Sequence, residues 1–106
     1  MGLFYNDEQA FDGYTLFSPN AYSTTYLIDN CGREVHRWNG NLLGGGATYL
    51  LENGNLLQTL QIGSPTFFGG GTSGRIEQIN WDGDLVWEYE YATEDVHQHH
   101  DVAYLP

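Results

Sequence analysis

The chain of 106 residues contains no lysine, and its only permanently cationic side chains are Arg33, Arg37 and Arg75. Fourteen acidic residues give it a formal net charge of -11 at pH 7. Binding to nucleic acid requires clustered Lys and Arg side chains, so we exclude a nucleic-acid partner. The same charge repels small anions at long range, so an anion site has to be built locally from Arg, His or backbone N–H groups.

Cysteine and long apolar runs are also scarce. Cys31 is the only cysteine, so the chain has no internal disulfide, and its turn-like Asn30-Cys31-Gly32 context offers no base to activate the thiol. We interpret Cys31 as a structural residue or as half of a bridge to a cysteine outside this chain. No apolar run approaches the ~20 residues that a membrane span requires, so we expect no membrane role. The N-terminus also lacks the basic and apolar regions of a signal peptide. This does not exclude secretion, because a fragment can lack the leader of its parent protein.

The sequence shows no helical pattern of apolar residues. It alternates short β-branched and aromatic runs with turns rich in Gly, Asn and Pro, as antiparallel strands do. Asn53-Gly54 between two apolar runs is a strong hairpin signal, because both residues tolerate the positive φ of a type I′ turn. We predict an all-β fold with strands in residues 13–17, 23–29, 34–38, 47–51, 55–60, 75–80 and 84–90.

Two parts of the chain resemble each other. An offset of 51 residues superposes Gly83 on Gly32 and also places Ile79 on Ile28 and Val86 on Val35. Turn glycines also match by chance between unrelated hairpins. However, a repeat of about 50 residues with four short strands is typical of a β-propeller blade.

We therefore predict a partial β-propeller domain over residues 1–106. It consists of about two adjacent four-stranded antiparallel sheets, the second incomplete, with Ile28, Val35, Ile79 and Val86 buried between them. Their unpaired outer faces and edges predict self-association or aggregation. The predicted segments are a leading segment 1–12, a first repeat 13–62, a Gly-rich loop 63–74 and a second repeat 75–106.

The residues best suited to chemistry are three histidines, His97, His99 and His100, which lie within four positions and are followed by Asp101. Imidazole exchanges protons near neutral pH, attacks electrophiles and binds metals. A solvated acidic loop is the alternative interpretation of the same residues. On an extended strand His97, His99 and Asp101 would project to one side, which also leaves open a zinc or copper site.

Four segments resemble the aryl-sulfate sulfotransferase family. They are the hairpin 26–38, the Leu51-Glu52-Asn53-Gly54-Asn55-Leu56-Leu57 turn region, the segment 82–89 and above all His99-His100-Asp101-Val102-Ala103-Tyr104-Leu105-Pro106. The resemblance covers almost the whole chain from Gly13 onward. It implies a six-bladed propeller, secreted or periplasmic. It further implies transfer of a sulfuryl group from a phenolic sulfate ester to a phenol through a sulfated histidine, without a nucleotide donor, cofactor or resident metal.

On this resemblance His99 and His100 fall on the family's His-His-Asp element, and His97 belongs to the approach to it. We expect these three histidines to be catalytic, with Asp101 orienting an imidazole and Arg75 binding the sulfuryl oxygens. Small phenolic sulfates and phenols are then the partners. The remaining blades, and the active-site residues they supply, are missing from this chain, so we interpret it as a fragment. The alternative is a non-catalytic secreted propeller that serves as a binding or structural module.

Overall fold

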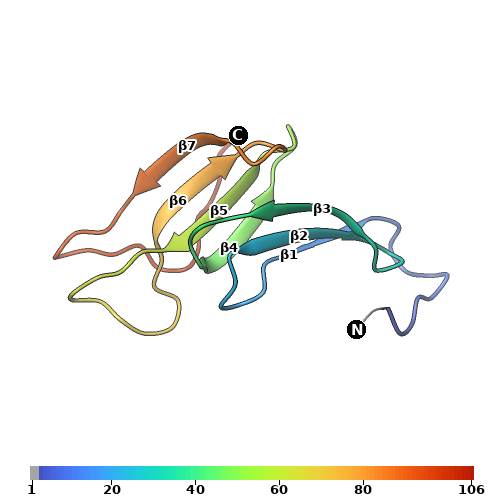
Figure 1. Ribbon diagram of the computed structural model, residues 1–106, viewed down its shortest axis with the longest axis horizontal. Coiled ribbons are helices and arrows are strands. Elements are labelled where there is room, and N and C mark those ends of the chain that lie inside the picture. Colours follow the sequence, from blue (N-terminus) through green and yellow to red (C-terminus); the bar gives the residue numbers. More distant parts are fainter. Residues whose placement is uncertain (1–2) are drawn as a thin grey trace.

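The structure, a computed structural model, describes residues 3–106 and shows an all-β chain without a helix in that range (Figure 1). The described part of the predicted leading segment, residues 3–12, precedes the first strand, and its first two residues lie outside the described range. The seven strands are β1 (Tyr14–Phe17), β2 (Thr24–Asp29), β3 (Glu34–Asn39), β4 (Gly44–Leu50), β5 (Leu56–Gln61), β6 (Gly74–Ile79) and β7 (Leu85–Glu90). All lie in or beside the stretches predicted from the sequence.

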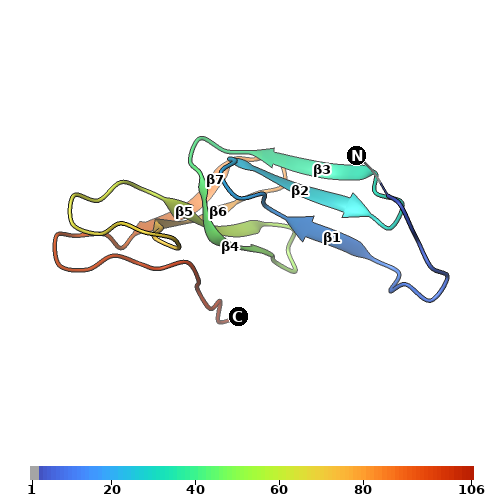
Figure 2. The same ribbon diagram turned by 90° about the horizontal axis from the view of Figure 1, so that it is seen from below.

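The strands form two antiparallel sheets, as predicted, but the strands are divided differently. The first sheet has three strands in the order β1-β2-β3, and the second has four in the order β4-β5-β6-β7 (Figures 1 and 2). The prediction of two four-stranded sheets with the second incomplete is therefore wrong. Strands β4 and β5, which fall in the predicted first repeat, belong to the second sheet because β5 pairs with β6 from Leu56↔Ile79 to Gln61↔Gly74.

The two sheets pack through a small apolar core. Leu27 and Trp38 of the first sheet contact Leu56 and Ile79 of the second, and all four side chains are buried. The Trp38 Nε1–H donates to the backbone carbonyl of Asn80 at 3.0 Å, so the buried indole has its hydrogen-bond partner. The packing therefore holds the β6–β7 turn against β3.

An aromatic cluster extends this contact. His36 stacks on Trp81 with ring centroids 4.0 Å apart, and its Nε2 lies 2.6 Å from the Trp81 carbonyl oxygen. Trp38 meets both rings edge to face. His36, outside the histidine cluster of residues 97–100, is therefore part of the contact between the sheets.

Hairpins β2–β3 and β6–β7 share their details at the 51-residue offset. In each turn the same two backbone hydrogen bonds form. In β2–β3 the Asp29 N–H donates to Arg33 O, and the Gly32 N–H donates to Asp29 O. In β6–β7 the Asn80 N–H donates to Asp84 O, and the Gly83 N–H donates to Asn80 O. Gly32 and Gly83 both have positive φ, at 74° and 90°. The ladder shifts register between Leu27 and Ile28, and again between Gln78 and Ile79.

These register shifts explain where the predicted core is wrong. Residue pairs Leu27↔His36 and Ile28↔Glu34 leave Val35 as the extra residue of a β-bulge, and Val86 has the same place between Trp87 and Leu85. Both valines lie on edge strands and are exposed, and Ile28 is only half-buried. Of the four predicted core residues, only Ile79 is buried between the sheets.

Candidate histidine site

The histidine segment, residues 97–101, lies against the Gly-rich loop of residues 63–74, at the end of the molecule far from the β2–β3 turn (Figures 1 and 2). The His100 N–H donates to Gly71 O at 2.7 Å, and the Ser73 N–H donates to Gln98 O at 3.1 Å. An isolated antiparallel bridge pairs Thr72 with His99. Residues 97–101 are therefore held in a defined conformation by backbone hydrogen bonds although they form no strand.

Gln98 fastens this segment to the start of β6. Its Oε1 accepts hydrogen bonds from the hydroxyl of Ser73, which is fully buried, and from the Gly74 N–H. Its Nε2 donates to the carbonyl oxygens of His99 at 2.6 Å and Asp101 at 3.0 Å. One side chain thus connects the backbone on both sides of His100 to the sheet. Gln98 was not among the predicted site residues, and its only signal in the sequence is its position between His97 and His99.

The side chains of His99 and His100 form a pair. Their Nδ1 atoms lie 2.5 Å apart, and the rings meet edge to face with centroids 4.7 Å apart. One Nδ1 donates and the other accepts, so the two nitrogens share one proton. In the neutral pair the donor imidazole then has a free lone pair on Nε2, and the acceptor imidazole carries its proton on Nε2. The pair therefore presents one nucleophilic nitrogen and one acidic N–H.

Two glycines with positive φ make room for this pair. A Cβ at Gly71 would lie 2.5 Å from Cε1 of His99, and a Cβ at Gly46 would lie 3.0 Å from Cβ of His100. Their φ angles are 86° and 125°, which L-residues with side chains rarely adopt. Each belongs to one of the two triple-glycine runs. The runs are therefore spatially linked to the histidines.

A Gly71→Ala variant tests this contact. We expect it to lose the roughly 1–2 kcal/mol of stability that left-handed backbone costs a residue with a Cβ, and in addition to displace the His99 ring. Gly54→Ala is the matched control, since Gly54 has the same φ of 86° and no neighbouring atom within 4 Å of a Cβ. Urea unfolding measures the first effect, and the NMR signals of the His99 and His100 rings measure the second. Unchanged ring signals in the Gly71 variant would contradict the contact.

His97 lies apart from the pair. Both of its ring nitrogens are buried without a hydrogen-bond partner, and Phe67 lies 5.8 Å away between ring centroids. A Cβ at Gly74 would meet Nε2 of His97 at 2.8 Å and Cγ1 of Ile62 at 2.9 Å, so the ring packs against this glycine and apolar neighbours. Of the three histidines predicted to be catalytic, the structure thus brings only His99 and His100 together.

Asp101 contacts a tyrosine rather than an imidazole. Its Oδ1 accepts from the Tyr49 hydroxyl at 2.6 Å and from the Val102 N–H at 2.8 Å. These two hydrogen bonds, with a smaller attraction from His100, lower the pKa of the Asp101 carboxyl. The hydrogen bond to the carboxylate raises the pKa of Tyr49. The carboxylate thus fastens the end of the histidine segment to β4, which differs from the predicted role of orienting an imidazole.

A Tyr49→Phe variant is expected to raise the pKa of Asp101 toward its ordinary value, because the largest cause of the lowering is removed. A carboxyl whose pKa is lowered by folding stabilises the fold above its unfolded pKa and loses that contribution as the pH falls through the folded pKa. The stability difference between the parent protein and Tyr49→Phe should therefore be full at neutral pH. The difference in stability between the two proteins should disappear below about pH 4, where the carboxyl becomes protonated. Chemical unfolding at several pH values measures it, with Tyr104→Phe as control, and a difference independent of pH would contradict the role of Asp101.

Arg75 does not reach the histidines. Its Nε donates to Glu77 at 2.8 Å, its NH1 donates to Glu90 at 2.8 Å, and its NH2 is bound to Glu88. Three carboxylates therefore surround the guanidinium that we expected to bind sulfuryl oxygens. Arg33 and Arg37 are likewise paired, with Asp29 and Glu34. Within residues 3–106 every arginine is bound to a carboxylate, and none faces the histidine pair.

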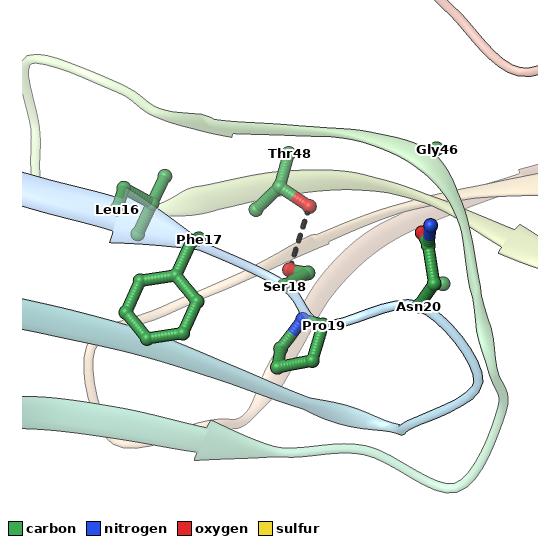
Figure 3. A pocket seen from close by; sticks show the side chains of 8 residues that line it. Leu16, Phe17, Ser18, Pro19, Asn20, Gly46 and Thr48 are labelled. Atoms are coloured by element: carbon green, nitrogen blue, oxygen red, sulfur yellow. Dashed lines mark hydrogen bonds between the residues drawn. The ribbon is translucent and has the colours of Figure 1, made fainter. Parts of the chain in front are cut away.

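A pocket of about 220 Å³ lies between the end of β1 and β4. The Ser18 hydroxyl is hydrogen-bonded to the Thr48 hydroxyl at 2.9 Å (Figure 3) and to the Thr25 hydroxyl at 2.6 Å. These hydroxyls connect β2 of the first sheet to β4 of the second. The residues that line the pocket are Leu16, Phe17, Ser18, Pro19, Asn20, Gly44, Gly46 and Thr48. No histidine is among them, so we do not assign the pocket to the histidine site.

Over the described range no group of three His, Cys, Asp or Glu side chains is arranged to hold a metal ion, so the site of His97, His99 and Asp101 considered above is not assembled. Residues 3–106 also contain no helix that could span a membrane. Comparison with protein-family models, with curated proteins and with solved structures finds no match to this chain.

Proposed function

We propose that the chain carries the histidine centre of a sulfuryl-transfer enzyme that moves a sulfuryl group from a phenolic sulfate ester to a phenol. The observation that carries this proposal is the His99–His100 pair, with its Nδ1 atoms 2.5 Å apart. Together with the resemblance of residues 99–106 to aryl-sulfate sulfotransferases, the pair favours chemistry that needs a nucleophile and an acid side by side.

In this proposal the imidazole that donates through Nδ1 attacks the sulfur with its Nε2. An N–S bond forms, and the S–O bond to the phenol breaks. The second imidazole gives its Nε2 proton to the departing phenolate and takes the shared Nδ1 proton, so that both rings stay neutral. An acceptor phenol then returns its proton to the second imidazole and attacks the sulfur. The N–S bond breaks, the shared proton moves back to Nδ1 of the first imidazole, and the starting pair is regenerated.

The fold we propose is a partial β-propeller of about two blades, belonging to a secreted or periplasmic protein. Supporting it are the two sheets packed face to face and the matching turns and bulges of hairpins β2–β3 and β6–β7. The histidine segment leaves the last strand at one end of the second sheet, where the loops of neighbouring blades would converge. Since the arginines of residues 3–106 are paired with carboxylates, the proposal assigns binding of the sulfuryl oxygens to backbone N–H groups rather than to these side chains.

The direct test is covalent labelling. The protein is incubated with 4-nitrophenyl sulfate, digested and analysed by mass spectrometry for a sulfuryl group on a peptide that contains residues 99–100. Nitrophenolate release in a burst that matches the labelled fraction supports the intermediate. Absence of both label and release, with the fold intact by circular dichroism, contradicts the proposal for this chain.

A non-catalytic role is the second candidate, and one observation favours it. His99 and His100 are exposed, and their segment is held by Gln98 and by the Tyr49–Asp101 contact, so the same geometry would serve a structural loop of a binding module. The labelling experiment separates the two candidates, because a structural loop takes up no sulfuryl group.

A further inference from the structure

The outer face of the second sheet carries an exposed row of aromatic side chains. Ile79 and Leu56 point toward the first sheet, so their neighbours Gln78 and Leu57 point away from it. Trp87 stands opposite Gln78, and Tyr89 stands opposite Ile76. Trp87, Tyr89 and Tyr91 therefore lie on the outer face, with successive ring centroids 6.2 and 6.3 Å apart. About half of each side chain is exposed, which is unusual for three aligned aromatic residues.

The same positions of the first sheet show what such a row packs against. At the 51-residue offset Trp87 corresponds to His36 and Tyr89 to Trp38. Trp38 is 2% exposed, because the second sheet covers it with Ile79 and the turn at Asn80 and Trp81. The row in the second sheet is thus equivalent to one side of an existing contact between sheets, but no other sheet of residues 3–106 packs on it.

The outer face of the first sheet is equivalent to the inner face of the second sheet, the face that covers Trp38. Ile28 corresponds to Ile79 and Asp29 to Asn80, and Ile28 is half-buried where Ile79 is buried. The Asn80 carbonyl accepts from Gly83 N–H and from Trp38, whereas Asp29 O accepts from Gly32 N–H. A carbonyl oxygen has two lone pairs, so Asp29 O can accept a further donor such as the Tyr89 hydroxyl. Phe17 and Tyr26, stacked 5.5 Å apart, add apolar surface beside it.

We propose that these two faces bind each other between copies of this chain. The Trp87–Tyr91 face of one copy packs on the Phe17–Tyr26–Ile28 face of the next, in the way that the two sheets pack within one copy. Because the two faces differ, the contact is head-to-tail and produces a ring or an open chain of copies. This association does not depend on sulfuryl transfer.

The charge of the chain adds a second expectation. A net charge of -11 per copy opposes association at long range, and salt screens that repulsion. The aromatic rings of the contact are uncharged, and Arg37, which lies over the Tyr26 ring, is already paired with Glu34 of its own copy, so salt chiefly screens the repulsion between copies. Oligomers should therefore become more stable as the ionic strength rises.

Light scattering coupled to size exclusion gives the test. The parent protein should form oligomers of two or more copies. Trp87→Glu on one face and Phe17→Glu on the other should each weaken association by at least about 30-fold, as expected for a central aromatic contact. Phe68→Glu is the control, since Phe68 is 86% exposed in the Gly-rich loop and belongs to neither face.

Mixing the variants identifies the geometry. A Trp87→Glu copy retains an intact first-sheet face and a Phe17→Glu copy retains an intact second-sheet face, so a mixture of the two monomeric variants should form 1:1 dimers that grow no further. Circular dichroism checks that both variants are folded. A parent protein that stays monomeric in high salt overturns the proposal. Oligomers that persist in both variants, or variants that fail to pair when mixed, overturn it as well.

Discussion

Replacing His99 or His100 by Gln should lower the rate of sulfuryl transfer from 4-nitrophenyl sulfate by about 10² to 10⁴-fold. Glutamine keeps a polar side chain of similar reach but has neither a nucleophilic nitrogen nor an exchangeable proton of suitable acidity. Since the two Nδ1 atoms share one proton, losing either imidazole also removes the partner that fixes the tautomer of the other. The double variant should therefore lose little more than the worse single variant.

The controls for this experiment lie in the same segment. Glu94→Gln changes an exposed residue that precedes the histidines and should keep nearly the full rate. His97→Gln should lower stability through lost packing rather than remove a reacting group, because the His97 ring lies against Gly74 and Ile62 and not beside the His99–His100 pair. If both His99 and His100 variants retain near-normal rates, the pair is a structural element and the enzymatic proposal is wrong.

Replacing Trp38 by Ala should destabilise the chain by about 3–5 kcal/mol, the usual cost of truncating a buried aromatic residue to Ala. Trp38 is the largest of the four buried core side chains, and its Nε1–H donates to Asn80 O. Its loss leaves Leu27, Leu56 and Ile79 without their common neighbour. Because small domains have only about 5–15 kcal/mol of stability, the sheets should separate or the chain should unfold.

Urea unfolding followed by circular dichroism measures this effect. Trp38→Phe serves as an intermediate variant, since it keeps an aromatic ring but removes the N–H donor, and it should cost less than Ala. Phe68→Ala, at an exposed position, should stay within about 0.5 kcal/mol of the parent protein. A Trp38→Ala variant as stable as the Phe68 variant would show that the two sheets do not depend on this core.

The hairpins were predictable because their signals are local. The glycines at 32, 54 and 83 mark the turns, and all three hairpins are present. The type I′ turn expected at Asn53-Gly54 is wrong, because only Gly54 has positive φ and its N–H donates to Leu51 O. The burial of Val35 and Val86 was predicted wrongly because each is the extra residue of a bulge, which interrupts the alternation of inward and outward side chains. The division of strands between sheets was not predictable from these patterns either, because no local signal shows that β5 pairs with β6 across the loop at residues 62–73.

The candidate site was predictable in its residues but not in its contacts. Spacing alone brought His99 and His100 together, since they are adjacent in sequence. The partners of Asp101 and Arg75 come from other strands, so the Tyr49 hydroxyl and the three glutamates were not foreseeable from the sequence around them. The glycines at 46, 71 and 74 were the signal that could have placed the histidine segment, because a side chain is excluded where an imidazole packs against the backbone.

The order of strands within each sheet follows the order of the chain. Every strand pair is therefore closed by a single loop, and no crossover has to wait for a distant segment. Such sheets have short sequence separations for all-β structures, which favours fast formation of one hairpin after another. The contact of Trp38 and His36 with residues 80 and 81 spans more than 40 residues of chain, so it should form late in folding. We therefore expect the docking of the two sheets, rather than strand pairing, to set the rate of folding.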